Sequence, residues 1–127
     1  MDNGAPIRRL SVLPRKSPRT LRHRDRYTVA VDVVLFTIQD EALKVLLVKR
    51  ATVPYRGAWS LPGGFVRKEE SVDEAAFREL QEETGISRVY LEQLYTFGDL
   101  DRDPRGRVIS VSYYAVVDSE RLKAQAR

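Results

Sequence analysis

The chain of 127 residues is predicted to adopt a mixed α/β fold, either an α+β arrangement or a mixed α/β sandwich. Residues 28–38 and 108–117 are rich in β-branched and other apolar side chains, which predicts two buried strands. Between them, residues 71–84 carry the one clear helix pattern. The length suits one compact domain and is too short for two ordinary ones. We therefore expect a sheet built around one central helix.

The first strand is expected to belong to a hairpin. Residues 28–38 (TVAVDVVLFTI) form this strand, residues 39–42 are a polar turn, and residues 43–50 (LKVLLVKR) return as the second strand. A short strand over residues 59–61 then runs into a turn at Pro62-Gly63-Gly64.

The central helix has a clear start and a clear end. Ser71 followed by Glu74 predicts a capping box, and Gly85 is a natural C-terminal stop. Four residues share one arc and are expected to face the core: Ala76, Phe77, Leu80 and Thr84.

The second half of the chain is predicted to add two strands. Residues 91–97 form a strand, residues 98–107 (GDLDRDPRGR) form a charged loop, and residues 108–117 form the last strand. The polar residues 118–127 are expected to start a helix. The order is thus strand-rich with one central helix.

Composition excludes several classes of chemistry. The chain has no cysteine, which excludes disulfides, cysteine-bound zinc, iron–sulfur clusters and a cysteine nucleophile. Its single histidine, His23, cannot build a multi-histidine metal site. No apolar run approaches the roughly 18 residues of a membrane span, and no secretory signal is evident. We expect a cytoplasmic protein without a membrane partner, whose metal chemistry would have to use carboxylates.

The positive charge is concentrated at the N-terminus. Residues 1–26 hold eight Lys and Arg residues against two Asp residues, a balance of +6, whereas residues 27–127 sum to −2. We divide the chain into a flexible basic arm, 1–26, and a folded domain, 27–127. Three interpretations of the arm stay open: a solvated extension, a contact with nucleic acid or an anionic surface, and a transit peptide.

Three glutamates on the helix call for an explanation. Glu79, Glu82 and Glu83 lie on one arc, where their charges repel one another. They also lie in the last turns, where the helix dipole disfavours negative charge. A solvated charged face is one explanation. The other is a site for a hard divalent cation, because Mg²⁺ and Mn²⁺ prefer carboxylate oxygens.

The surrounding residues resolve this choice. Residues 64–86 read GFVRKEESVDEAAFRELQEETGI, with Gly64, Glu70, Arg78-Glu79-Leu80, Glu82-Glu83 and Gly85-Ile86 at the fixed spacing of the Nudix box. The chain therefore resembles the Nudix hydrolase family over roughly residues 27–117. The resemblance implies a Nudix-type α/β/α sandwich with a mixed sheet.

The resemblance also implies roles for the matched residues. Glu79, Glu82 and Glu83 would bind Mg²⁺ or Mn²⁺, with the Gly64 carbonyl as a backbone ligand. Glu70 would brace the loop and reach a metal through water, and Arg78 would orient Glu79. We assign catalysis to Glu79, Arg78 and Glu83. A further base is expected from a later loop, where each acid is otherwise simply solvated; the candidates are Asp99, Asp101, Asp103, Asp118 and Glu120.

The substrate class follows from the same resemblance. Family substrates consist of a nucleoside diphosphate linked to another group. The TFGD and DRDPRGR segments are similar to ADP-ribose pyrophosphatases and to Nudix-related transcriptional regulators of NAD metabolism (NrtR-like). We assign substrate binding to Arg50, Arg102, Arg105, Arg107, Trp59 and Tyr55. Arg105 and Arg107 could instead pair with Asp101 and Asp103, and each aromatic candidate (Tyr55, Trp59, Tyr95 and Phe97) could instead belong to the core.

Two functions stay open. The first is hydrolysis of ADP-ribose to AMP and ribose 5-phosphate; the second is sensing of ADP-ribose in a regulator, where a winged-helix domain would follow. A Nudix domain is expected to continue with a further strand and a closing helix, so the chain is either a fragment or a variant that a partner completes. An uncovered sheet face predicts a homodimer. Nucleic acid would bind only through the arm or through a domain absent here.

Overall fold

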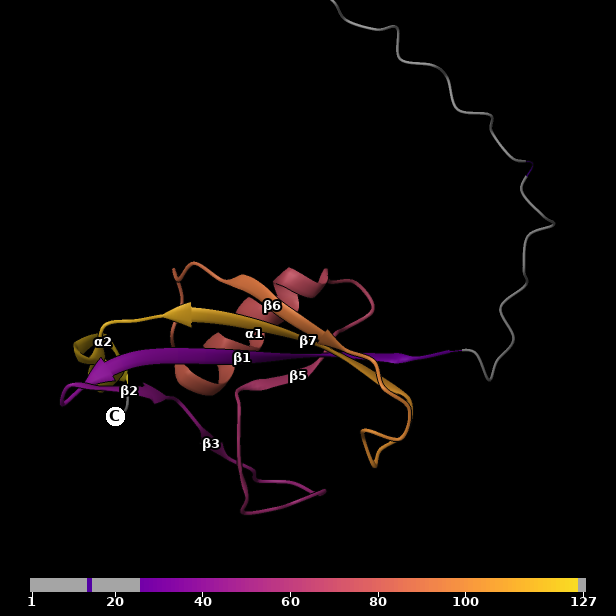
Figure 1. Cartoon of the computed structure of the whole chain (residues 1–127), viewed down its shortest axis with the longest axis horizontal. Coiled ribbons are helices and arrows are strands. Elements are labelled where there is room, and N and C mark those ends of the chain that lie inside the picture. Colours follow the sequence, from indigo (N-terminus) through magenta and orange to yellow (C-terminus); the bar gives the residue numbers. More distant parts are fainter. Residues whose placement is uncertain (1–13, 15–25, 126–127) are drawn as a thin grey trace, which may run out of the picture.

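The computed structural model describes Pro14 and residues 26–125. The basic arm predicted for residues 1–26 thus lies outside the described residues, apart from Pro14 and Arg26. The described part is a mixed sheet with two helices, which confirms the predicted fold class (Figure 1). Among these residues, no helix combines the length and the apolar character needed to cross a membrane.

The sheet is organised around two long central strands. β1 (Thr28–Gln39) pairs in parallel with β7 (Val108–Val116), and this parallel pair makes the sheet mixed. β6 (Glu92–Phe97) forms the outer edge beside β7. β2 (Ala42–Val45) pairs with β1 on the other side and completes the predicted hairpin.

The strand predicted over residues 43–50 is divided in two. β2 ends at Val45, and the chain then leaves β1 to form β3 (Val48–Lys49), which pairs with β4 (Trp59–Ser60) in a separate two-stranded sheet. The apolar run was continuous in sequence, but its two ends have different pairing partners. This departure sends Arg50 and the following loop away from the main sheet.

The turn predicted at Pro62-Gly63-Gly64 is wrong in part. Gly63 and Gly64 belong to β5 (Gly63–Phe65), which pairs antiparallel with the first half of β1. A Cβ on Gly63 would lie 2.2 Å from the Val31 carbonyl oxygen. Glycine is needed here for close backbone approach, which a sequence reading cannot distinguish from a turn.

α1 (Val72–Thr84) begins and ends as predicted. The Ser71 side chain accepts a hydrogen bond from the Glu74 amide, and Gly85 ends the helix in a left-handed conformation with φ of 75°. Leu80 and Ala76 are fully buried against the sheet, but Phe77 is 43% exposed and does not join the core. Ala75 is fully buried instead, so the packed face of α1 includes this position and not Phe77.

Both helices contact the same face of the sheet. The core joins α1 to Val31, Val33 and Leu35 of β1, and Leu122 of α2 (Ser119–Gln125) packs against the same cluster. α2 confirms the helix expected after the last strand. In the described residues no helix covers the opposite face, where Ile38 and Val116 are exposed.

Candidate active site

The C-terminal half of α1 approaches β5 and carries the three glutamates. Residues Glu79, Glu82 and Glu83 lie within the last two turns of the helix. Contacts between α1 and β5 hold this part of the helix beside the two glycines of β5. Local capping positions the helix, and its apolar face then directs the acidic arc toward β5.

Arg78 links four acceptors around this arc. Its Nε and Nη2 donate to the two oxygens of Glu70 at 2.8 and 2.6 Å, and Nη1 donates to Glu79 Oε1 at 2.6 Å. Nη1 also reaches Glu82 Oε2 at 3.3 Å, and Nη2 donates to the Phe65 carbonyl at 3.0 Å. The guanidinium thus fixes Glu70 and Glu79 relative to β5.

Glu70 is held by backbone as well as by Arg78. Its Oε1 accepts the Arg67 amide at 2.8 Å, which closes the turn before the helix. Hydrogen bonding to Arg78 lowers the pKa of Glu70 to about 2, and the Arg67 amide adds to this effect. Hydrogen bonding to Glu70 and Glu79 raises the pKa of the Arg78 guanidinium above its ordinary value. Glu70 is therefore a charged brace at neutral pH.

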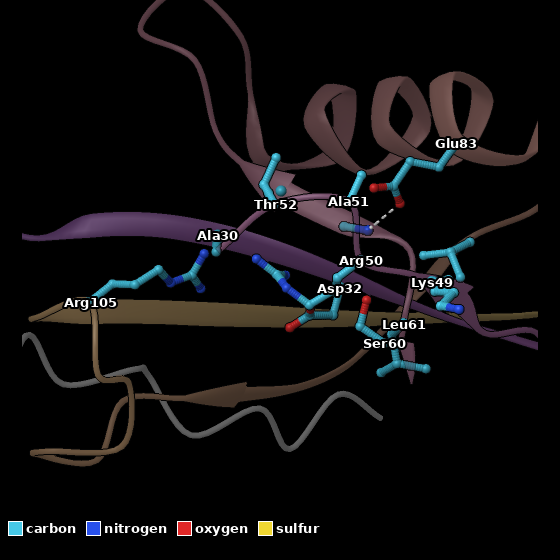
Figure 2. Close-up of a pocket in the computed structure, with 13 residues that line it drawn as sticks. Ala30, Asp32, Lys49, Arg50, Ala51, Thr52, Ser60, Leu61, Glu83 and Arg105 are labelled. Atoms are coloured by element: carbon cyan, nitrogen blue, oxygen red, sulfur yellow. Dashed lines mark hydrogen bonds between the residues drawn. The ribbon is translucent and has the colours of Figure 1, made fainter. Parts of the chain in front are cut away.

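The two glycines of β5 touch the carboxylates of α1. The Gly63 amide donates to Glu83 Oε2 at 2.8 Å (Figure 2). A Cβ on Gly64 would lie 2.5 Å from Glu79 Oε1, so the Gly64 backbone lies directly against that carboxylate. Burial raises the pKa of Glu83, the Gly63 amide opposes this rise, and Glu79 adds to it.

These residues fit a hard divalent cation by the chemistry of their donors. Carboxylates and a backbone carbonyl are oxygen ligands, and the glycine at position 64 leaves room for close approach to Glu79. In the described conformation, no group of three acidic or histidine side chains among residues 26–125 is arranged to hold a metal ion. Glu79 is paired with Arg78, and Glu83 accepts the Gly63 amide.

A pocket of about 360 Å³ opens beside Glu83. Its walls come from β1, β3, β4, β5, the chain after β3, and the loop before β7 (Figure 2). Three cationic side chains line it: Lys49, Arg50 and Arg105. The pocket therefore places Glu83, one residue of the acidic arc, beside a positively charged wall, and such a wall suits an anionic ligand.

Arg50 is anchored by the loop that it begins. Its Nε donates to the Pro54 carbonyl at 2.7 Å, and its own carbonyl accepts the Gly57 amide at 2.8 Å. Its guanidinium points toward that of Arg105 in Figure 2. The structure thus brings two predicted substrate-binding residues to one pocket from segments 55 positions apart in sequence.

Arg105 is held in place by Asp103. The carboxylate accepts from Nε at 3.0 Å and from Nη2 at 2.7 Å, and the Arg105 guanidinium lies 4.6 Å from the centre of the Phe65 ring. Hydrogen bonding to Arg105 lowers the pKa of Asp103 to about 2. Asp103 raises the pKa of Arg105, with a smaller contribution from Asp32.

The other predicted substrate-binding residues lie outside this pocket. Arg102 donates to the Val108 carbonyl at 3.2 Å, and Arg107 donates to the Gly98 and Asp99 carbonyls at 2.9 and 3.2 Å. Both therefore brace the 98–107 loop. Trp59 and Tyr55 are 65% and 64% exposed and do not line the pocket.

The remaining aromatic and acidic candidates also lie elsewhere. Tyr95 and Phe97 form an edge-to-face pair on β6, with ring centres 4.9 Å apart. Asp118 caps α2 by accepting the Glu120 amide at 2.8 Å. Asp101 and Asp103 line a separate depression of about 400 Å³ formed by the loop itself. None of the five acids proposed as a downstream base lines the pocket beside Glu83.

Two charged residues of the pocket, Asp32 and Lys49, were missed by sequence reasoning. Asp32 lies within β1, and Lys49 ends β3. Asp32 is the one charged residue in an otherwise apolar segment, TVAVDVVLFTI, and this is the signal that could have found it. Lys49 carries no comparable signal, because surface lysines are common at strand ends.

Comparison with known proteins identifies the family of this chain. The family model described as NUDIX domain matches residues 26–127. The chain therefore belongs to the Nudix family, and the resemblance inferred from the box residues is confirmed.

Two curated relatives indicate which members of the Nudix family this chain is similar to. The chain is 43% identical over 96 residues to the ADP-ribose pyrophosphatase of Methanocaldococcus jannaschii, covering 76% of this chain and 54% of that protein. It is 36% identical over 99 residues to the ADPR responsive transcriptional repressor NtrR of Acinetobacter baylyi, covering 76% of this chain and 40% of the repressor. The chain thus spans about half the length of these curated relatives or less.

A solved structure shares the fold. The NUDIX domain of Shewanella oneidensis NrtR complexed with ADP ribose superposes with a TM-score of 0.69 at 43% identity, covering 73% of this chain and 62% of that one. The chain is therefore a Nudix domain related both to an ADP-ribose pyrophosphatase and to ADP-ribose-responsive regulators.

Proposed function

We propose that this chain hydrolyses a nucleoside diphosphate linked to another group, and that the substrate is ADP-ribose, which yields AMP and ribose 5-phosphate. The observation that carries the proposal is the position of Gly64 and Glu83 beside a pocket lined by Arg50 and Arg105. Glu83 of the acidic arc lies beside the cationic wall there, and a metal-dependent diphosphate reaction requires both kinds of group. Similarity to an ADP-ribose pyrophosphatase supports the choice of substrate.

Each residue has a distinct role in this proposal. Mg²⁺ or Mn²⁺ would be held by Glu79, Glu82, Glu83 and the Gly64 carbonyl, with Glu70 behind them. When bound, such a cation neutralises a diphosphate and lowers the pKa of a bound water. Arg78 keeps Glu79 oriented through the 2.6 Å ion pair.

The cationic wall would bind the phosphates. Arg50 and Arg105 both present guanidinium groups to the pocket, and a guanidinium matches phosphate oxygens with paired N–H donors. In the reaction, the water oxygen forms a bond to one phosphorus as the bridging P–O bond breaks. No covalent intermediate is needed, which suits a site without cysteine or histidine.

Product analysis with ADP-ribose and Mg²⁺ tests the proposal. We expect AMP from the wild-type chain and a loss of at least about 100-fold in kcat for Glu83→Gln. Glu74→Gln is the matched control, because it makes the same change at an exposed position of the same helix. Equal activity of Glu83→Gln and wild type would refute the assignment of Glu83.

A sensor is the second candidate function. Two observations favour it: the similarity to an ADPR responsive repressor, and the engagement of Glu79 and Glu83 by Arg78 and the Gly63 amide. A sensing domain would bind ADP-ribose without consuming it. A rise in melting temperature with ADP-ribose, together with no AMP, would favour this function over hydrolysis.

We also propose that the chain self-associates through the sheet face that neither helix of the described residues covers. Ile38 and Val116 are exposed there, and Leu94 is exposed on the edge strand β6. We expect a homodimer in the cytoplasm, because such apolar surface favours association. Light scattering on the purified chain would give its mass in solution, and a monomer at micromolar concentration would contradict the expectation.

A further inference from the structure

An acidic residue forms part of the floor of the cationic pocket. Asp32 lies on β1, on the face of the sheet opposite the helices, and lines the same pocket as Lys49, Arg50 and Arg105. Its Oδ2 accepts the Ser110 hydroxyl at 2.5 Å. Ser110 is only 3% exposed, so its position on β7 is fixed by packing. The carboxylate is therefore held in a defined orientation.

The second oxygen of this carboxylate is available to a ligand. The described residues donate no hydrogen bond to Asp32 Oδ1, and this oxygen is not a buried atom. In residues 26–125 the Ser110 hydroxyl is the one hydrogen-bonding partner of the Asp32 carboxylate. Arg105 interacts with this carboxylate electrostatically, but no cation among these residues lies within ion-pair distance of it. Arg105 is paired with Asp103 instead, and Arg50 Nε with the Pro54 carbonyl.

Phosphate binding alone does not explain why an acidic residue, Asp32, lies on the floor of this pocket. A carboxylate repels a phosphate and would weaken the binding of any ligand that is only anionic. An ionised carboxylate only accepts hydrogen bonds, so its favourable partners are N–H and O–H donors. In a diphosphate ligand with a sugar attached, the sugar hydroxyls supply such donors close to the phosphates.

We propose that Asp32, oriented by Ser110, is a specificity-determining residue that accepts hydrogen bonds from sugar hydroxyls of the ligand. This inference rests on the proposed function, since it concerns the same pocket. It extends that function by assigning separate parts of the ligand to separate walls. The cationic side chains bind the diphosphate, and the β1 floor selects ligands that carry a sugar.

Equilibrium binding measurements distinguish the contribution of the sugar from that of the diphosphate. Affinities of wild type and Asp32→Asn are measured for ADP-ribose, UDP-glucose and inorganic pyrophosphate. The titrations use EDTA to prevent turnover, and they are repeated with Mg²⁺ in a Glu79→Gln background. Asp32→Asn keeps the size of the side chain but removes its charge. The matched control is Asp40→Asn, at an exposed turn that asparagine tolerates with φ of 53°.

We expect Asp32→Asn to weaken ADP-ribose binding about tenfold or more, because a charge-assisted hydrogen bond is lost. Pyrophosphate binding should be unchanged or tighter, because a repulsive charge is removed. Ser110→Ala should produce a smaller change in the same direction, because it loosens the carboxylate without removing it. Melting temperatures identify any variant that fails to fold. If Asp32→Asn does not fold, the test is the effect of Ser110→Ala on ADP-ribose affinity relative to its effect on pyrophosphate affinity.

The outcomes distinguish this inference from the proposed function. If UDP-glucose binds in place of ADP-ribose and Asp32→Asn weakens it selectively, the choice of ADP-ribose is wrong and the inference stands. An equal loss for sugar-containing ligands and pyrophosphate would overturn the inference alone. Wild type that binds pyrophosphate but no sugar nucleotide, or none of the three ligands, would overturn both.

Discussion

The Asp103 carboxylate accepts two hydrogen bonds from the Arg105 guanidinium, at 3.0 Å from Nε and 2.7 Å from Nη2. The Arg105 backbone N–H also donates to Asp103 Oδ1, at 2.9 Å. This pair fixes an otherwise flexible side chain over Phe65 and at the edge of the pocket. Asp103 is thus a positioning residue for Arg105.

Replacement of Asp103 should act through Arg105. Asp103→Asn removes one half of the ion pair, and we expect KM for the diphosphate substrate to rise about tenfold with little change in kcat. Steady-state kinetics on ADP-ribose would measure both parameters. Asp40→Asn serves as the charge-matched control, because its ion pair with Lys44 lies at an exposed turn. A fall in kcat at unchanged KM would contradict a positioning role.

Gly64→Ala should impair activity more than stability. The new Cβ would meet the Glu79 carboxylate at 2.5 Å, so this carboxylate would have to move away from its present position beside Arg78. We expect a loss of about 10- to 100-fold in kcat with a free energy of unfolding within about 1 kcal/mol of wild type. Kinetics and urea denaturation measure the two effects.

Two other glycines calibrate that experiment. Gly98→Ala adds a Cβ in open space and should leave both kcat and the free energy of unfolding unchanged. Gly63→Ala meets the Val31 carbonyl oxygen at 2.2 Å and should lower the free energy of unfolding by about 1–3 kcal/mol. Full activity of Gly64→Ala would show that the position of Glu79 against β5 is unimportant.

Arg78→Lys should disrupt the network although it keeps the charge. A lysine cannot donate two parallel hydrogen bonds to Glu70 while also reaching Glu79 and the Phe65 carbonyl. We expect a loss of about 10- to 100-fold in kcat, because the orientation of Glu79 depends on this contact. Arg67→Lys is the control, since Arg67 is mostly exposed and lies 3.7 Å from Glu82. Similar kinetics for the two variants would argue against a special role of the guanidinium.

The free energy of unfolding should fall at acid pH, because two carboxylates that are paired in the folded state become protonated. Pairing with arginine lowers the pKa of Glu70 from 4.5, and of Asp103 from 3.8, to about 2 in the folded state. Their contributions are therefore fully present above about pH 4.5 and are lost as the pH falls toward 2, because the unfolded chain takes up these protons first. Thermal melts between pH 6 and about 2 would show the decline.

The acid dependence can be assigned to one pair. Glu70→Gln removes the titrating group, so its melting temperature should change less between pH 5 and about 2.5 than that of wild type. Glu69→Gln, at an exposed neighbouring position, should keep the wild-type slope. Identical slopes for all three proteins would mean that Glu70 does not contribute to the acid transition.

Much of the fold and the acidic arc could be predicted from local pattern. The boundaries of α1 follow from Ser71 and Gly85, whose capping roles depend on residues a few positions away. The grouping of Glu79, Glu82 and Glu83 follows from helical periodicity alone. The spacing from Gly64 to Ile86 then identified the family, because this motif lies within one continuous segment.

The pocket depended on contacts between distant segments. Asp32 and Ser110 meet because β1 and β7 pair in parallel, and this pairing is invisible in either strand alone. Arg105 reaches the pocket while Arg102 and Arg107, in the same loop, bond to backbone carbonyls. Sequence pattern determines helix ends and periodic faces because the interactions responsible are local. Strand pairing and the direction of a loop arginine depend on tertiary packing, so only the folded structure could decide which charged groups share the site.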